Sequence, residues 1–108
     1  MSYPLRGQVW DIDFAAGTGM HPGVITSTNS LNARLGHVIA ALITGTPGPS
    51  ETHLPLGPAA GLTRYEESYL NITDLHAVDR YDVLRQCGLL APSEMHAVAE
   101  RLRTYLGL

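Results

Sequence analysis

Cysteine is almost absent from the sequence, since Cys87 is the only one. One cysteine cannot form a disulfide within its own chain, which favours a reducing compartment. The chain also lacks an apolar run of the roughly 18 residues that a membrane-spanning helix needs. Residues 1–7 lack the apolar core of a signal peptide. We therefore expect a soluble, cytoplasmic protein that makes no membrane contact.

Charge is also scarce, because only 16% of the residues are charged and the net charge is -3. Proteins that bind duplex DNA commonly have a basic stripe, and no such stripe is present. Any contact with nucleic acid must therefore be local. The glycine-containing loop at residues 15–19 is not followed by the lysine and helix of a phosphate-binding loop, so we expect an ordinary surface loop there.

The remaining composition is that of a globular protein, with 44% hydrophobic residues in 108 positions. This length predicts a single domain that spans residues 1–108. A domain of this size buries only a modest fraction of its surface, so pairing with a second subunit would add stability. The sequence contains no internal repeat and no low-complexity segment.

Two β-prone runs, residues 20–27 and 38–44, hold the densest apolar material in the chain. The first leads into a hydroxyl-rich stretch, whereas the second is apolar until it reaches Thr44 and is expected to be buried on both faces. The connector between them, residues 29–36, is polar and has turn formers at both ends, so we expect the two runs to form a hairpin-like pair. Such a pair would bring His21 and Thr44 into one neighbourhood.

Further alternating or apolar patterns predict strands at residues 8–14, 51–56, 68–75 and 83–90. The first of these is expected to have one core face, formed by Trp10, Ile12 and Phe14. Pro55 cannot donate to a strand ladder, so the second of these belongs at a sheet edge. Residues 79–82 are typical of a turn or a single helical turn. An amphipathic helix is expected to begin with Ser93 as its N-cap and to end at Gly107. No long helices separate the strands, which predicts an antiparallel sheet or small barrel.

His21 is the most promising of the five histidines for chemistry. It follows the flexible loop and precedes Pro22, which would hold it at the rim of the core. Histidine changes protonation near neutral pH and suits acid–base work, but the residues alone favour a purely structural histidine over a catalytic one. Thr44 is either a ligand contact or a turn residue. The histidines lack the short spacings of zinc sites, and no Gly-x-Ser-x-Gly elbow is present, so we expect neither a metal site nor a serine hydrolase.

The order of short motifs along the chain resembles the MazF/PemK (Kid) family of toxins from type II toxin–antitoxin pairs. The matching segments are residues 6–14 (Arg-Gly-Gln-Val-Trp-Asp-Ile-Asp-Phe), 21–27 (His-Pro-Gly-Val-Ile-Thr-Ser), 38–44 (Val-Ile-Ala-Ala-Leu-Ile-Thr), 76–80 (His-Ala-Val-Asp-Arg) and 91–95 (Ala-Pro-Ser-Glu-Met). Each motif is weak when taken singly. Their order and spacing across nearly the whole chain are the basis of the resemblance.

This resemblance implies a mainly β (α+β) fold, a small SH3-like antiparallel barrel with a C-terminal helix. It also implies a homodimer, a cognate antitoxin partner, and sequence-specific cleavage of single-stranded RNA (mRNA) without a metal or other cofactor. In the family, an Arg before Pro and a Thr that ends a strand perform catalysis, and His21 and Thr44 stand at these positions. The candidate RNA contacts are Ser27, Arg34, Thr46, Arg64 and His76, the last of which replaces a common family Arg.

The exchange of the family Arg for His21 leaves two hypotheses. A histidine can transfer protons, which Arg does poorly, but the loss of a fixed charge typically costs about 10²- to 10³-fold in rate. The chain is therefore expected to be an endoribonuclease toxin. The alternative is a catalytically weak or inactive interaction protein of the same fold, for example a CcdB-like toxin that acts on DNA gyrase. CcdB-like chains have a Trp before their terminal Gly-Ile, and residues 105–108 contain none, which disfavours this alternative.

Overall fold

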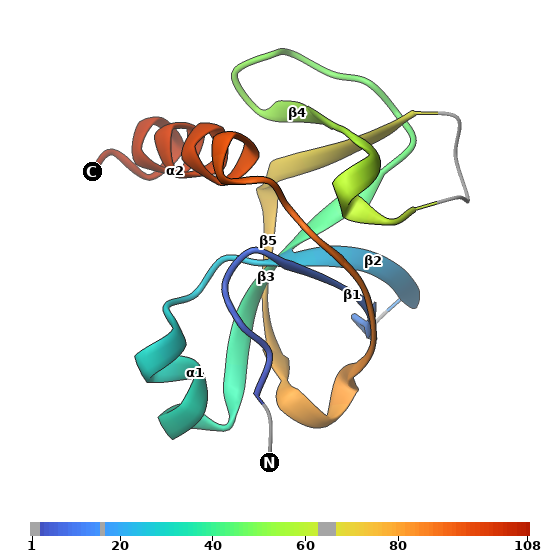
Figure 1. Cartoon of the computed structure of the whole chain (residues 1–108), viewed down its shortest axis with the longest axis vertical. Coiled ribbons are helices and arrows are strands. Elements are labelled where there is room, and N and C mark those ends of the chain that lie inside the picture. The colour runs from blue at the N-terminus through green and yellow to red at the C-terminus, as the bar shows by residue number, and fades with distance from the viewer. Residues whose placement is uncertain (1–2, 16, 63–66) are drawn as a thin grey trace.

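The computed structural model describes residues 3–15, 17–62 and 67–108. Its centre is one antiparallel sheet in the order β4-β5-β3-β2-β1-β6. The strands are β1 (Gln8–Asp13), β2 (Met20–Ile25), β3 (His37–Thr44), β4 (His53–Leu56), β5 (Ser68–Asp79) and β6 (Val83–Leu89). Two α-helices, α1 (Asn29–Leu35) and α2 (Pro92–Leu106), and two short 3₁₀ turns, η1 (Pro58–Ala60) and η2 (Arg80–Asp82), complete the fold (Figure 1).

Strand β3 lies inside the sheet and is buried on both faces, as its apolar run predicts. Successive side chains of a strand point to opposite faces. Accordingly, Ala41 and Ile43 belong to one apolar cluster, which also contains Val98 of α2. Val38, Ala40 and Leu42 belong to a second cluster, together with Ile12 and Phe14 of the β1 segment. We call these two sides of the sheet the helix face and the site face.

The first strand differs from its prediction in one respect. The sequence predicted one core face formed by Trp10, Ile12 and Phe14, and Ile12 and Phe14 are buried on the site face with Trp10 packed beside them. Val9, however, is fully buried on the helix face. Both faces of β1 therefore contribute to the core, because α2 covers the side on which Val9 lies.

The two edges of the sheet, β4 and β6, are brought together by η1 rather than by strand pairing. Turn η1 follows β4 and packs on β6, and this contact requires two glycines. A Cβ on Gly88 would collide with the carbonyl oxygens of Ala59 and Ala60, and a Cβ on Gly61 would collide with that of Cys87. Gly61 also has a φ of 69°, which favours glycine. The fold is therefore barrel-like without a closed ladder, and the small antiparallel barrel with a C-terminal helix is confirmed.

Helix α2 packs on the helix face, but its start differs from the prediction. Ser93 is not the N-cap, because the helix begins at Pro92 with Ala91 in the cap position. Proline suits the first helical position, since its missing N–H would have no partner there. The Glu94 carboxylate takes the capping role and accepts hydrogen bonds from the backbone N–H of Ala91 (2.9 Å) and Gly57 (2.9 Å). Gly107 ends the helix in the left-handed conformation, as predicted.

The connector between β2 and β3, predicted only as a polar link with turn formers at both ends, contains the helix α1. Helix α1 starts after Thr28, whose carbonyl accepts from the N–H groups of Leu31 and Asn32. The buried Asn32 side chain donates to the carbonyls of Pro4 and Ser27, which fixes the helix against the N-terminal segment. These long-range bonds are not visible as a local sequence pattern.

Each of the remaining elements is of the type that the sequence predicts, although some bounds differ. Strand β4 lies at a sheet edge, with Pro55 in it. The strand predicted at 68–75 extends to Asp79, and the predicted turn at 79–82 contains η2, with the Asp79 carboxylate accepting from the N–H of Tyr81. Among the described helices, none has the length and apolar character needed to cross a membrane.

Candidate functional site

The antiparallel β2–β3 pairing places the two candidate catalytic residues at the same end of these strands, with His21 near the start of β2 and Thr44 at the end of β3. Gly23 lies opposite Leu42 and Val24 lies opposite Ala41. When this register is continued by two residues, His21 lies opposite Thr44. Directly opposed residues in an antiparallel pair have Cβ atoms about 4.5–5.5 Å apart and share one face of the sheet. His21 and Thr44 are both half-buried, and the alternation of their strands puts both on the site face.

His21 has an unusual polar environment. It pairs with Ile12 of β1 on one side, so its ring lies at the edge of the site-face core. Its Nδ1 is buried and has no hydrogen-bond partner. Among the described residues, no other buried side-chain nitrogen or oxygen lacks a partner. A buried polar atom without a partner typically costs about 1–3 kcal/mol, so such atoms occur more often at functional sites than elsewhere.

Thr44 presents a hydroxyl whose proton is available for a ligand. Its Oγ1 accepts a hydrogen bond from the backbone N–H of Thr46 at 3.1 Å, which uses one acceptor position and orients the oxygen. A hydroxyl has one donor proton in addition to its acceptor sites. Thr46 itself is exposed in the turn that follows β3. The turn therefore aims the Thr44 hydroxyl, and Thr46 lies next to it at the surface.

His76 lies on the same face, on the other side of β3. It is opposite Ala40, which shares its side of β3 with Leu42 and Thr44. The His76 ring meets the edge of Phe14 with ring centroids 5.0 Å apart, and its Nε2 lies 2.5 Å from Oδ1 of Asp74. His76 is thus held by an aromatic contact on one side and a carboxylate on the other.

Phe14 links this histidine to the β2 strand. A Cβ built on Gly23 would lie 2.9 Å from Cζ of Phe14, so the Phe14 ring covers Gly23 directly. Gly23 is two residues from His21 on the same side of β2. Phe14 and Asp74 did not stand out as site residues in the sequence. Only the register between strands that are distant in the chain reveals them.

Two other candidates, Ser27 and Arg34, lie apart from this pair. The Ser27 hydroxyl donates to Oδ1 of Asn32 (2.5 Å) and accepts from the N–H of Ile39 (3.0 Å), so it holds α1 against β3. Arg34 is exposed on α1, before the start of β3, whereas Thr44 ends that strand. The seven steps from His37 to Thr44, at about 3.3 Å each, make β3 about 23 Å long, so Arg34 and Thr44 lie near its opposite ends. Arg64 lies outside the described residues.

The described histidines, cysteine and carboxylates form no group of three that could hold a metal ion. His96 lies on the exposed side of α2 and pairs with Glu100 at 2.9 Å. His37 is exposed at the start of β3. His21 and His76, unlike these two surface histidines, lie on the site face.

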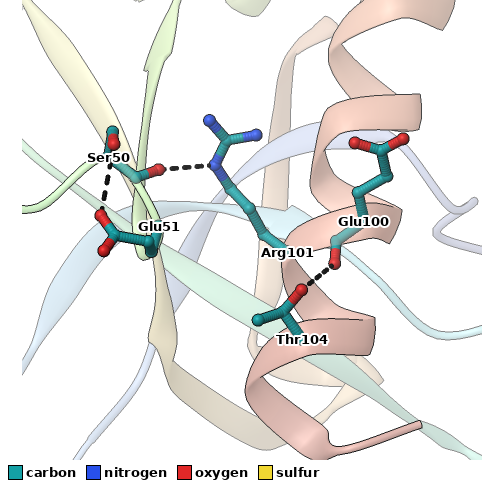
Figure 2. Close-up of a pocket in the computed structure, with 5 residues that line it drawn as sticks. All are labelled: Ser50, Glu51, Glu100, Arg101 and Thr104. Carbon is teal, nitrogen blue, oxygen red and sulfur yellow. Dashed lines mark hydrogen bonds between the residues drawn. The ribbon is translucent and has the colours of Figure 1, made fainter.

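A separate cavity of about 280 Å³ lies between α2 and the loop before β4, away from His21. It is lined by Ser50, Glu51, Glu100, Arg101 and Thr104 (Figure 2). The Arg101 guanidinium reaches across it and donates to the carbonyl oxygen of Ser50 at 2.9 Å, as the dashed line in Figure 2 shows. It also donates to the carbonyl of Ala97 at 3.3 Å. This contact fastens the loop to the helix, which is a structural role.

The charged groups near β6 form one further cluster. Arg85 donates to Oδ2 of Asp11 from both Nε (3.2 Å) and Nη2 (3.0 Å), which joins β6 to β1. Burial raises the pKa of the neighbouring Cys87 thiol, and the Asp11 carboxylate raises it further against the opposing effect of Arg85. At neutral pH this thiol is protonated and is a poor nucleophile.

Comparisons with known proteins agree with the sequence resemblance. No curated protein matches the chain. Two solved structures of endoribonucleases from mycobacterial species are each 30% identical to it. The first covers 100% of the chain and 95% of its own length with a TM-score of 0.84, and the second, in complex with its cognate antitoxin, covers 97% and 96% with a TM-score of 0.85.

A toxin of Mycobacterium tuberculosis, MazF-mt6, is 23% identical and has the same fold, with a TM-score of 0.82 over 94% of the chain and 97% of that toxin. The model of PemK-like, MazF-like toxins of type II toxin–antitoxin systems matches residues 5–106. This match covers nearly the full length of the chain. The chain therefore belongs to the PemK-like, MazF-like family of toxins from type II toxin–antitoxin systems.

Proposed function

We propose that this toxin cleaves single-stranded RNA at specific sequences, without a metal ion, through His21 and Thr44. The observation that supports the proposal is the β2–β3 register, which ends at Gly23 and Leu42 and, continued by two residues, would put these two side chains opposite each other on the site face. Family membership and 30% identity to solved endoribonucleases support the class of reaction. Proton transfer by His21 would replace the fixed positive charge of the family Arg.

The chemistry requires three tasks around one phosphate. The 2′-hydroxyl loses its proton and attacks the adjacent phosphorus, the 5′-oxygen leaves and gains a proton, and a 2′,3′-cyclic phosphate remains. His21 is the side chain at the site that can move protons near neutral pH. The Thr44 hydroxyl donates a hydrogen bond to a non-bridging phosphate oxygen, where negative charge builds up in the transition state.

The other predicted RNA contacts have different roles in this proposal. His76, held between Phe14 and Asp74, offers its ring to a nucleotide next to the cleaved bond. Thr46 would bind near Thr44, and Arg34 would contact a phosphate at the far end of β3. Ser27 already donates and accepts within the fold, so RNA could use only its remaining acceptor position. Arg64 remains a sequence-based RNA contact.

We also propose a cytoplasmic homodimer that a cognate antitoxin neutralises. One of the solved relatives at 30% identity is in complex with its cognate antitoxin. A 108-residue chain leaves much of its surface exposed, and large apolar side chains such as Leu84 (52% exposed) and Leu89 (57% exposed) lie on β6. A partner subunit or antitoxin would cover surface of this kind.

The test is cleavage of a pool of single-stranded RNAs in the presence of EDTA. The wild type should cut the pool at a recurring short sequence and leave 2′,3′-cyclic phosphate ends. His21→Ala and Thr44→Ala should each cut about 10²- to 10⁴-fold more slowly while keeping the wild-type melting temperature. His96→Ala, which changes an exposed histidine away from the site, serves as the matched control and should cut at the wild-type rate.

Two outcomes would contradict the proposal. If the folded wild type leaves the pool intact, the chain acts as a non-catalytic interaction protein. If cleavage occurs but vanishes in EDTA, a metal ion takes part and the roles given to His21 and Thr44 are incomplete.

A further inference from the structure

We infer that Tyr81, held by Arg80, is a stacking site for a base of the RNA several nucleotides away from the cleaved bond. This inference rests on the proposed RNA cleavage. It concerns the tyrosine–arginine cluster (Tyr3, Arg80 and Tyr81) at the connection between β5 and β6. None of these residues belongs to the site around His21 and Thr44.

The geometry of the cluster presents an ordered aromatic ring to solvent. The guanidinium carbon of Arg80 lies 4.7 Å from the ring centroid of Tyr3 and 5.5 Å from that of Tyr81. Both distances are within the roughly 6 Å over which a cation is attracted to a ring face. Tyr81 is nevertheless 80% exposed. Its ring therefore contacts Arg80 while most of its surface remains open.

The backbone around Tyr81 is also fixed. The Asp79 carboxylate accepts from the N–H of Tyr81 at 2.9 Å, and the N–H of Arg80 donates to the carbonyl of Gly36 at 3.1 Å. Gly36 ends α1, whose last turn contains Arg34. A ring that is already positioned loses less conformational freedom when a ligand stacks on it.

The surroundings of the ring are charged rather than apolar. Arg80 contacts the ring directly, and Asp79 and Asp82 flank the same short turn. Aromatic rings beside arginines are typical of surfaces that bind single-stranded nucleic acid, because every base has a face that can stack and every phosphate is negative. Stacking of this kind depends little on base identity.

The position of the cluster predicts which nucleotides it contacts. His37 begins β3 and lies opposite Asp79, directly before η2, whereas Thr44 ends the strand about 23 Å away. In Figure 1 the β5–β6 connection is at the lower end of the molecule near the N-terminus, and the loop after β3 is at the upper end. At about 3.4 Å per stacked nucleotide, the two sites are about seven nucleotides apart, and fewer if the strand is extended.

The experiment compares two RNA pools of randomised sequence, one of about 4 and one of about 14 nucleotides, of which only the longer spans both sites. Both carry 2′-O-methyl groups, so that no 2′-hydroxyl can attack and binding is measured alone by fluorescence anisotropy. Tyr81→Ala should weaken binding of the longer pool by about 5- to 150-fold and leave the shorter pool unchanged. Tyr81→Phe retains the ring and should bind both pools as the wild type does.

The matched control is Tyr105→Ala, which removes another exposed tyrosine, on α2, and should leave both pools unaffected. The inference is overturned if Tyr81→Ala binds the longer pool as tightly as the wild type does, or if its affinity falls by the same factor for both pools. It is also overturned if Tyr81→Ala alters the molar mass measured by light scattering, since the ring would then belong to an interface between copies of the chain.

The same data separate this inference from the proposed function. A wild type that cleaves unmodified RNA while Tyr81→Ala binds normally refutes only the stacking site. A wild type that neither cleaves RNA nor binds either pool refutes both.

Discussion

The close contact between Gly23 and Phe14 offers a test of how the site face is packed. A Cβ at position 23 would lie 2.9 Å from Cζ of Phe14, 3.1 Å from Cδ1 of Ile12 and 3.1 Å from the carbonyl oxygen of Ala41. Two of these neighbours are side-chain ends, and the third is backbone that cannot move away easily. Gly23→Ala should therefore displace Phe14, and overpacking of this kind costs about 1–3 kcal/mol of stability.

The matched control is Gly57→Ala. A Cβ there would meet only Oε2 of Glu94, at an ordinary 3.6 Å, and Gly57 has a φ of -88° that any residue can adopt. Both substitutions restrict the unfolded chain equally, a gain of about 0.4–1 kcal/mol that cancels in the comparison. The difference between the two variants in urea unfolding thus isolates the steric cost, expected at about 1–3 kcal/mol.

A second substitution identifies the contact responsible. In the Phe14→Leu background the ring no longer covers position 23, so Gly23→Ala should cost less there than in the wild type. A coupling of about 0.5 kcal/mol or more between the two sites would confirm direct contact. The packing described for the site face is wrong if Gly23→Ala and Gly57→Ala unfold at the same urea concentration. It is also wrong if the effects of Gly23→Ala and Phe14→Leu on the free energy of unfolding are additive in the double variant.

Three further predictions concern other parts of the fold. Val98→Ala should cost about 2 kcal/mol in urea unfolding, because it removes about two buried methylene equivalents at 0% exposure and leaves a cavity, and a cost near zero would mean that α2 does not pack as described. Arg101→Ala should speed proteolysis in the loop before β4, whereas Arg103→Ala, a nearby exposed arginine, should not; equal rates would refute the Arg101–Ser50 contact. Because its pKa is raised, Cys87 should react with iodoacetamide at about pH 8 more slowly in the folded than in the unfolded chain. Asp11→Asn should speed the folded reaction by lowering that pKa, and an unchanged rate would contradict the influence of Asp11.

Much of the fold could be predicted from local pattern. Each of these elements has its own local pattern of hydrophobic residues: a continuous apolar run in β3, alternation in β1 and β5, and a stripe at spacings of three and four in α2. All of them form where expected. Helix α1 could not be predicted in this way, because its stability depends on the buried Asn32 and its bonds to Pro4 and Ser27. The start of α2 was placed two residues too far along, since Pro92 at the first helical position outweighs Ser93 as a cap.

The candidate site was only partly visible in the sequence. Two strands joined by a short connector tend to pair, so the sequence could predict that β2 pairs with β3. This pairing is what puts His21 and Thr44 at the same end of the two strands. The contact between Phe14 and His76 depends on the order β5-β3-β2-β1, and a single sequence does not specify that order. The tyrosine–arginine cluster likewise joins the N-terminal segment to a turn almost eighty residues later.

The central claim is that His21 supplies the proton transfer for RNA cleavage, and its most direct test is the pH dependence of the single-turnover cleavage rate. Between about pH 5 and pH 8, the range in which histidines change charge, the wild-type rate should rise or fall about tenfold per pH unit on at least one limb. His21→Arg has no group at that position that titrates in this range, so its profile should lose that limb. Identical profiles for the wild type and His21→Arg, with both proteins folded and active, would contradict the account.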